Sequence, residues 1–397
     1  MNALAPRIRR YFVWQHRWVG LALTFFLIVI GITGSLLAYR EEIDRLLNPD
    51  LYARPIPGAR PLDLATLAER AEAIDPHARV WYFYQTRNDH VSLRCVPRTD
   101  PATGKPFDID YDHLILDPIT GREIARLKTY GARSFGRRTF MSYVYDLHTS
   151  VMCGGAGWNF LGYVAVLWVL DCFVGFYLTL PIGWTQFWTR WTPAWQVRWG
   201  ATLFRRLFDL HRAPGLWLWP MLFVFAWSGV MFNCRPVYER VTHALFDYKS
   251  EMDELPMPTG KVVERPRLGW REALRIAEQR MEDVAGRRGF WVDRAVGFAY
   301  IAEVGMYNYT VLSSLDFRRS PPGTDIMIDG NTGELKAVML PRGEHAGNTI
   351  GNLLWGLHYG DLYGWSLYRL FVAVFGWVVV LLSLTGVYIW WRKRRRA

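Results

Sequence analysis

The stretch His16-Arg17-Trp18-Val19-Gly20-Leu21 returns in the second half of the chain as His211-Arg212-Ala213-Pro214-Gly215-Leu216. Histidine, arginine, glycine and leucine occupy the same places in both copies. A further glycine follows each histidine at the same interval, at Gly34 and Gly229. A repeat of this kind, placed at the start of an apolar segment each time, predicts a chain built from two related halves.

A second pair of histidines repeats in the same way, as Leu147-His148 and Leu357-His358. Each is followed by a glycine, a hydrophobic residue and a tyrosine, at 175–177 and at 386–388. Histidine is costly in a bilayer and is a good axial ligand of haem iron. Four histidines in two matched sets therefore indicate a metal cofactor and electron transfer across a membrane.

Hydropathy predicts a membrane protein with substantial soluble parts. The 397 residues are 51% hydrophobic and 21% charged and include 20 tryptophans, a mixed composition. Four windows can cross roughly 30 Å of hydrocarbon, at about 18–39, 160–180, 216–233 and 367–391. Two hydrophilic stretches, at about 41–145 and 235–349, separate the first window from the second and the third from the fourth.

Basic residues predict the orientation. They cluster before the first window, in the short connection between the second and third windows, and in the run 392–396 after the fourth. The positive-inside rule makes all three segments cytoplasmic, so both hydrophilic stretches face the periplasm. The net charge of +11 is then mostly explained by the basic residues of the cytoplasmic segments. We expect no nucleic-acid partner, because no basic surface interleaved with aromatic residues is evident.

The two hydrophilic stretches also repeat each other. Each has a helical pattern, at 61–74 and 270–281, followed by alternating apolar segments typical of strands. Each then contains an Asp-x-x-Thr-Gly turn after a strand, at 117–121 and 329–333. Aspartate and threonine can cap the turn amides and glycine tolerates positive φ. The pattern predicts a duplicated α+β module.

The turn motifs and the span motifs Asp209-Leu210-His211-Arg212 and Leu357-His358-Tyr359-Gly360 resemble the PepSY-associated transmembrane family of bacterial iron uptake. The resemblance covers nearly the whole chain and is strongest to haem-containing siderophore reductases of the ferrioxamine type. It implies a membrane α-helical fold, with a four-helix transmembrane bundle of two pseudo-symmetric halves and a periplasmic α+β PepSY-type module inserted in each. The division that we predict is the N-terminus and first span at 1–40, the first module at 41–145, the second span at 146–182, a Trp-rich cytoplasmic connection at 183–206, the third span at 207–234, the second module at 235–349, and the fourth span with its basic tail at 350–397.

Symmetry predicts how the histidines pair. Halves related by an axis along the membrane normal place His16 with His211 at the cytoplasmic edge and His148 with His358 at the periplasmic edge. Each pair would hold one noncovalent haem b, with Arg17 and Arg212 neutralising propionates at the inner face and Arg137, Arg138 or Arg235 at the outer face. The glycines at 20, 34, 215 and 229 would allow a porphyrin to approach the backbone.

Several alternatives accompany this assignment. A single histidine beside an arginine at an interface is often a membrane anchor. His148 and His358 precede the dense apolar sequence, which places them high, where they hold a haem or bind substrate iron directly. Asp171, inside the second span, is a buried hydrogen-bond partner or serves a proton or quinone role. The tryptophans at 184–199 form an interfacial helix or a quinol-docking surface.

The cytoplasmic segments are too short for a flavin or NAD domain, and no Gly-rich dinucleotide turn is evident. Electrons must then come from quinol or from a separate donor protein. The sequence predicts an enzyme of the inner membrane that reduces ferric siderophore at the periplasmic face, with His148 and His358 nearest the substrate. Loose candidates for chelate contacts are residues 81–84, Tyr300, Tyr307 and Tyr309. The alternatives are a non-redox PepSY binding or inhibitory protein, and a siderophore or solute permease component.

Overall fold

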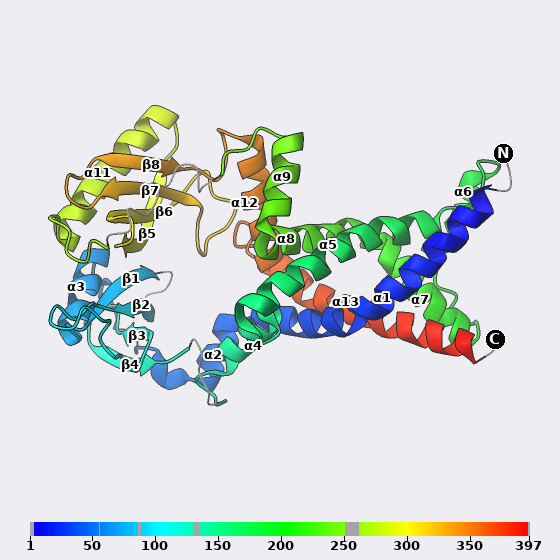
Figure 1. The fold of residues 1–397 in the computed structure, drawn as a ribbon, viewed down its shortest axis with the longest axis horizontal. Coiled ribbons are helices and arrows are strands. Elements are labelled where there is room, and N and C mark those ends of the chain that lie inside the picture. Colours follow the sequence, from blue (N-terminus) through cyan, green and yellow to red (C-terminus); the bar gives the residue numbers. More distant parts are fainter. Residues whose placement is uncertain (1–3, 55, 86–88, 130–134, 251–261, 396–397) are drawn as a thin grey trace.

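The computed structural model describes residues 4–395, apart from 55, 86–88, 130–134 and 251–261. Figure 1 shows a β-sheet with covering helices at one end of the molecule and a bundle of long helices that carries both termini at the other. We call these the sheet end and the terminal end. Arg396, in the basic run used above to predict orientation, lies outside the described residues.

Within the described residues, each half of the chain contributes four strands to one antiparallel sheet with the order β4-β3-β2-β1-β5-β6-β7-β8. The first half supplies β1 (Ala78–Tyr84), β2 (Val91–Pro97), β3 (His113–Leu116) and β4 (Glu123–Leu127). The second half supplies β5 (Val292–Ile301), β6 (Met306–Ser313), β7 (Thr324–Asp329) and β8 (Leu335–Met339).

The two modules join edge to edge. β1 pairs antiparallel with β5, with Tyr82 opposite Ala299 and Tyr84 opposite Gly297. A strand at the edge of a sheet exposes unpaired N–H and C=O groups, and this pairing satisfies them for both modules. The sequence predicted two modules, and the structure unites their strands into a continuous sheet.

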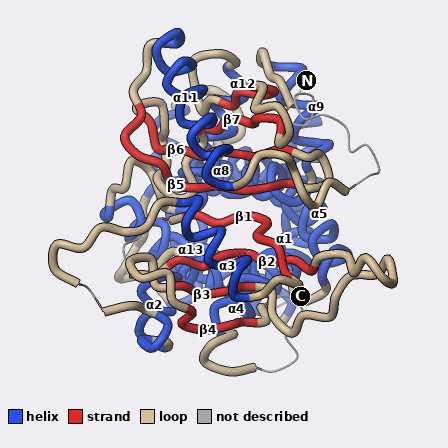
Figure 2. Tube along the Cα trace, turned by 90° about the vertical axis from the view of Figure 1, so that its left-hand side faces the viewer, coloured by secondary structure: helices blue, strands red, loops and turns tan. Residues whose placement is uncertain are grey.

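One helix from each module covers the sheet face that points away from the bundle, as Figures 1 and 2 show for α3 (Leu64–Ile74) and α11 (Trp270–Arg288). The carboxylate of Asp63 caps α3 by accepting the amide of Thr66 at 2.8 Å. Apolar residues at helical spacing then turn one side of each helix onto the strands, which gives the main core of the sheet end.

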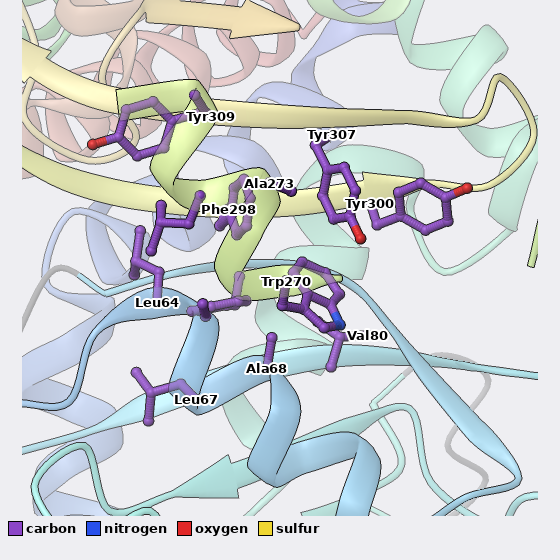
Figure 3. Close-up of a cluster of buried hydrophobic side chains, with 14 of the residues drawn as sticks. Leu64, Leu67, Ala68, Val80, Trp270, Ala273, Phe298, Tyr300, Tyr307 and Tyr309 are labelled. Carbon is purple, nitrogen blue, oxygen red and sulfur yellow. The ribbon is translucent and has the colours of Figure 1, made fainter. Parts of the chain in front are cut away.

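Figure 3 shows that Tyr300, Tyr307 and Tyr309 belong to this core, beside Trp270 and Phe298. Their side chains lie between the sheet and the helices and are at most 4% exposed. The suggestion that these tyrosines contact a chelate is therefore wrong, because alternation along β5 and β6 turns them to the covered face. Tyr84, on the opposite face, is 36% exposed.

The described residues contain three helices that are long and apolar enough to span a membrane, namely α1 (Leu4–Leu37), α5 (Gly154–Thr179) and α13 (Ser366–Arg394). A fourth span is formed if α7 (Leu203–Trp217) and α8 (Trp219–Asn233) are counted as one. These two helices meet at an angle of 71°. The third predicted span, at 207–234, is therefore bent at Leu218, because Pro214 lies inside α7 and Pro220 lacks the amide that an unbroken helix needs.

Close backbone contact holds the long helices together. A β-carbon at Gly31 of α1 would lie 2.7 Å from the carbonyl oxygen of Gly376 on α13, so both positions require glycine. On the other side of the bundle, a β-carbon at Gly162 of α5 would lie 2.4 Å from the carbonyl oxygen of Asn233 on α8. Small residues of this kind let membrane helices approach closely.

His148 and His358 lie on short helices separate from the spans that follow them. These are α4 (Phe140–Ser150) and α12 (Ala346–Tyr359). Left-handed residues end both helices, Val151 with φ 44° and Gly360 with φ 70°. The chain therefore turns back after each histidine, and the expectation that the histidines lie high on extensions of the spans was wrong.

Short helical segments complete the fold. At the sheet end these are α2 (Arg40–Leu47), the 3-10 turn η1 (Pro49–Leu51) and α9 (Arg235–Leu245). In the Trp-rich connection they are α6 (Phe187–Trp191) and the 3-10 turn η2 (Thr192–Trp195). Trp184 and Trp188 of this connection are 86% and 72% exposed, and their position at a membrane interface stays a prediction.

Candidate metal centres

The four repeated histidines meet as two pairs. The ring centres of His16 on α1 and His211 on α7 are 6.2 Å apart, with 59° between the ring planes. The rings of His148 on α4 and His358 on α12 are also 6.2 Å apart, with 66° between them. Each pair joins one residue from each half of the chain. We call these the terminal-end pair and the sheet-end pair.

Each pair lines its own cavity in the bundle. The cavity at the terminal-end pair has a volume of about 410 Å³ and is also lined by Gly20, Gly175, Gly215 and Gly386. β-Carbons at Gly175 and Gly386 would lie 3.4 and 3.3 Å from Cε1 of His16 and His211. These two glycines therefore let the imidazoles approach the backbone of the neighbouring helix.

The cavity at the sheet-end pair has a volume of about 240 Å³ and is lined by Gly34 and Gly229. A β-carbon at Gly34 would lie 3.1 Å from Cε1 of His148. All four glycines predicted to border a cofactor thus line one of the two cavities. Trp168 and Val379 line both cavities, so their side chains occupy the region between them.

A hydrogen bond within the same half of the chain orients each ring through Nδ1. His16 Nδ1 lies 2.9 Å from Asp171 Oδ1, and His211 Nδ1 lies 2.9 Å from the carbonyl oxygen of Leu382. A carboxylate and a carbonyl can only accept, so Nδ1 carries the proton in both rings. Nε2 then keeps its lone pair.

Hydroxyl groups orient the imidazole rings of the sheet-end pair through Nδ1. Thr33 Oγ1 lies 3.0 Å from His148 Nδ1 while donating to the carbonyl of Val29, and Ser228 Oγ lies 2.7 Å from His358 Nδ1 while donating to the carbonyl of Phe225. Since each hydroxyl proton is already engaged, its oxygen accepts from the imidazole. All four Nε2 atoms are therefore left with a lone pair for a metal ion.

The predicted arginines divide into two groups. Arg17 and Arg212 line the terminal-end cavity, where Arg212 also donates to Asp209 at 3.0 Å. Asp209 is fully buried and receives further ion pairs from Arg198 and Arg205. Sequence reasoning missed this cluster, because the repeat places Trp14 at the position equivalent to Asp209 in the first half.

The arginines predicted for the outer face lie elsewhere. Arg137 and Arg138 pair with Asp50, and Arg235 pairs with Glu239. None of these three lines the sheet-end cavity among the described residues, whereas Arg40 does. The assignment of Arg137, Arg138 or Arg235 to that cavity was wrong, because these arginines pair with carboxylates that do not line it.

The second half of the chain has Ser228-Gly229 where the first half has Thr33-Gly34, and the structure shows why serine can replace threonine here. Thr33 and Ser228 supply the hydroxyl groups that hold His148 and His358, so serine does this as well as threonine. Thr385, before Gly386, likewise lies 3.2 Å from His211 Nδ1. The recurring Thr/Ser-Gly dipeptide was the sequence signal for these partners.

The residues present fit two haem groups. Two imidazoles that bind one iron from opposite sides, each at about 2 Å, have ring centres about 6 Å apart, as both pairs do. Metal-bound histidines typically donate their second ring N–H to a carboxylate, carbonyl or other acceptor, as all four do here. The adjacent glycines leave room beside the rings where a β-carbon would intrude.

The apolar helices and the antiparallel sheet define a membrane protein with two paired-histidine cavities. The model of the PepSY-associated TM region matches residues 13–393. The chain therefore belongs to this family, as the sequence motifs suggested. Comparison with curated proteins found no match.

Proposed function

We propose that this protein is a diheme b-type oxidoreductase of the bacterial inner membrane that reduces ferric siderophore at its sheet end. The observation that carries the proposal is the geometry of the two histidine pairs, each 6.2 Å between ring centres and each with Nδ1 engaged. Haem, when bound, supplies a one-electron couple between Fe(III) and Fe(II). His16 and His211 would hold one group, and His148 and His358 the other.

The membrane orientation is part of the same proposal. Basic residues lie at the terminal end, among them Arg9, Arg17 and the arginines at the end of α13. The positive-inside rule then makes the terminal end cytoplasmic and the sheet end periplasmic. Electrons would enter near His16 and His211 from quinol or from a separate donor protein.

Aromatic side chains connect the sheet-end pair with the surface. The ring of Phe232 is centred 5.2 Å from that of His358, and the ring of Trp355 is centred 5.3 Å from Phe232. Trp355 also lines a polar cavity of about 280 Å³, and the guanidinium of Arg318 lies 4.3 Å from its ring centre. This arrangement supports electron exit at the sheet end.

The polar cavity opens between α12 and the sheet face opposite α3 and α11. Asn352 of α12 and Asn308 and Asp325 of the strands line it. A chelate too large to enter the bundle could meet the protein here. Reduction would release the metal, because hard hydroxamate or catecholate oxygens hold Fe(III) far more tightly than Fe(II).

The test uses the full-length protein, reduced with dithionite under anaerobic conditions and freed of excess reductant. Addition of a ferric hydroxamate should reoxidise the protein, and a ferrous-specific chelator should develop its colour at the same rate. His358→Ala should slow this transfer even where the terminal-end group still reduces. His77→Ala, which changes a histidine remote from both cavities, should leave the rate unchanged.

Two results would count against the proposal. Reduced protein that is stable towards every ferric chelate but is reoxidised by a quinone would indicate a quinone-linked electron conduit. A purified protein that contains no haem after expression with adequate haem supply would favour a non-redox binding or inhibitory protein.

A further inference from the structure

The two halves of the terminal-end centre differ at two equivalent positions, and the first of these carries a charge in one half only. Gly175 faces His16 and Gly386 faces His211, and the residues four places before these glycines are Asp171 and Leu382. His211 donates to the backbone carbonyl of Leu382, whereas His16 donates to the side-chain carboxylate of Asp171. The repeat thus replaces a neutral acceptor by a charged one.

The second of these positions lies three residues later, and here it is the second half of the chain that has the polar side chain. Thr385 adds a hydroxyl at 3.2 Å from His211 Nδ1, and the first half has Val174 at the matching place. The second half therefore holds its ring with a carbonyl and a hydroxyl. The first half holds its ring with the carboxylate of Asp171, at 2.9 Å.

The carboxylate acts mainly on the imidazole. Asp171 is 7% exposed on α5 and lines the terminal-end cavity. Among the residues that the structure describes, His16 is the one side chain at ion-pair distance from it. Arg9, a cation at the same cavity, instead donates to the carbonyls of Leu178 and Leu180. No arginine or lysine within that described set therefore forms an ion pair that would offset the charge facing His16.

A carboxylate that accepts the Nδ1 proton of a metal-bound imidazole makes Nε2 a more basic ligand. A more basic ligand favours Fe(III) over Fe(II) and lowers the reduction potential. The sheet-end pair is held by the hydroxyl groups of Thr33 and Ser228, which carry no charge. The two centres therefore differ in the charge of the groups that hold their ligands.

We propose that Asp171 is a positioning residue that lowers the reduction potential of the His16–His211 centre below that of the His148–His358 centre. Electrons then move downhill from the terminal end to the sheet end, in the direction that release of iron requires. This inference rests on the proposed function for its direction. The effect of Asp171 on the reduction potential does not depend on which compound accepts the electrons.

The test is an optical redox titration of the purified holoprotein, wild type against Asp171→Asn. Asparagine keeps an acceptor oxygen of the same shape and removes the charge. We expect the lower midpoint to rise, so that at the wild-type midpoint the ratio of reduced to oxidised centre increases about tenfold, or about 59 mV for one electron. The higher midpoint should stay in place.

Two further variants distinguish the effect of the Asp171 charge on the midpoint from a structural effect of the substitution. The double variant Asp171→Leu with Val174→Thr copies the second half and should also raise the lower midpoint, which provides the test even if Asp171→Asn binds haem poorly. Thr33→Val alters the partner of His148 and should leave the lower midpoint unchanged. Electron paramagnetic resonance of the oxidised protein should show a changed signal from one ferric centre in the Asp171 variants.

The inference is overturned if both Asp171 variants keep both haem groups and both wild-type midpoints. It is also overturned if they lower the haem content of the His16–His211 centre while the fraction of that centre that stays loaded keeps its wild-type midpoint. A shifted midpoint in a protein that reduces no ferric chelate would uphold the role of Asp171 and reject the proposed substrate. A wild-type protein without haem would reject both.

Discussion

Thr33 holds the imidazole of His148, with Oγ1 3.0 Å from Nδ1. The hydroxyl proton of Thr33 is engaged by the carbonyl of Val29 at 2.7 Å, so the oxygen accepts from the ring. One residue later, the absence of a side chain at Gly34 admits Cε1 of the same imidazole. The Thr-Gly dipeptide of α1 therefore fixes both the position and the protonation of His148.

Replacing Thr33 with valine should weaken haem binding at the sheet-end pair by about 10- to 100-fold, the usual effect of removing a hydrogen-bond partner behind a metal ligand. The measurement is the rate at which haem transfers to an excess of an apo-haem protein. Thr242→Val is the matched control, because the hydroxyl of Thr242 donates to the carbonyl of Tyr238 within its own helix and the residue lines neither histidine cavity. Equal rates of haem loss from the two variants would contradict the role of Thr33.

Replacing Gly31 with alanine should destabilise the bundle by about 1–3 kcal/mol, the usual range for overpacking. The new methyl group would lie 2.7 Å from the carbonyl oxygen of Gly376, and backbone cannot move aside cheaply. Thermal unfolding in detergent measures the loss. Gly155→Ala on α5, where a β-carbon meets nothing within 4 Å, should show no such decrease. Equal unfolding temperatures would argue against close packing of α1 on α13.

Replacing Asp209 with asparagine should destabilise the terminal end by about 1.5–3 kcal/mol, because it removes the charge of the buried acceptor that pairs with Arg198, Arg205 and Arg212. Thermal unfolding followed at the Soret band would report the loss. Asp50→Asn removes an exposed partner of Arg137 and Arg138 and should have little effect. A stable Asp209 variant would show that the cluster is dispensable.

The first module should lose stability as the pH falls through the range from about 6.5 to about 4. Burial lowers the pKa of His113 on β3 to about 4, against about 6.5 in an unfolded chain. The unfolded state therefore binds the proton first, so the stabilisation is complete above about 6.5 and declines below it. Amide hydrogen exchange of β3 against pH measures this. His113→Gln should flatten the profile, and an unchanged slope would refute the assignment.

Much of the architecture follows from local pattern. Alternation along 78–84 and helical spacing along 64–74 predicted β1 and α3, because burial against one face leaves a periodic trace in the sequence. The duplication also predicted which histidines lie near each other. The pairing of β1 with β5 was not predictable, since an edge strand carries no mark of the strand that it will join.

The sequence predicted which histidines form the two candidate centres, but it predicted only part of their arrangement in space. The turn at Val151, where a non-glycine residue adopts φ 44°, folds α4 back beside α1 and could not be read from the sequence. The role of Leu382 as the partner of His211 was also not predictable, because Leu382 accepts the hydrogen bond through its backbone carbonyl, which any residue can supply. Asp171 was conspicuous by its charge, and the structure gives it His16 as partner.

The haem content of the purified protein, measured as the pyridine haemochrome, tests whether the two histidine pairs are haem ligands. We expect about two noncovalent b-type haem groups per chain, since His16 with His211 and His148 with His358 form two complete ligand pairs. His211→Ala and His16→Ala should each retain about one group, and the same one. A wild-type protein with no haem, or variants of both partners that keep two six-coordinate groups, would contradict this expectation.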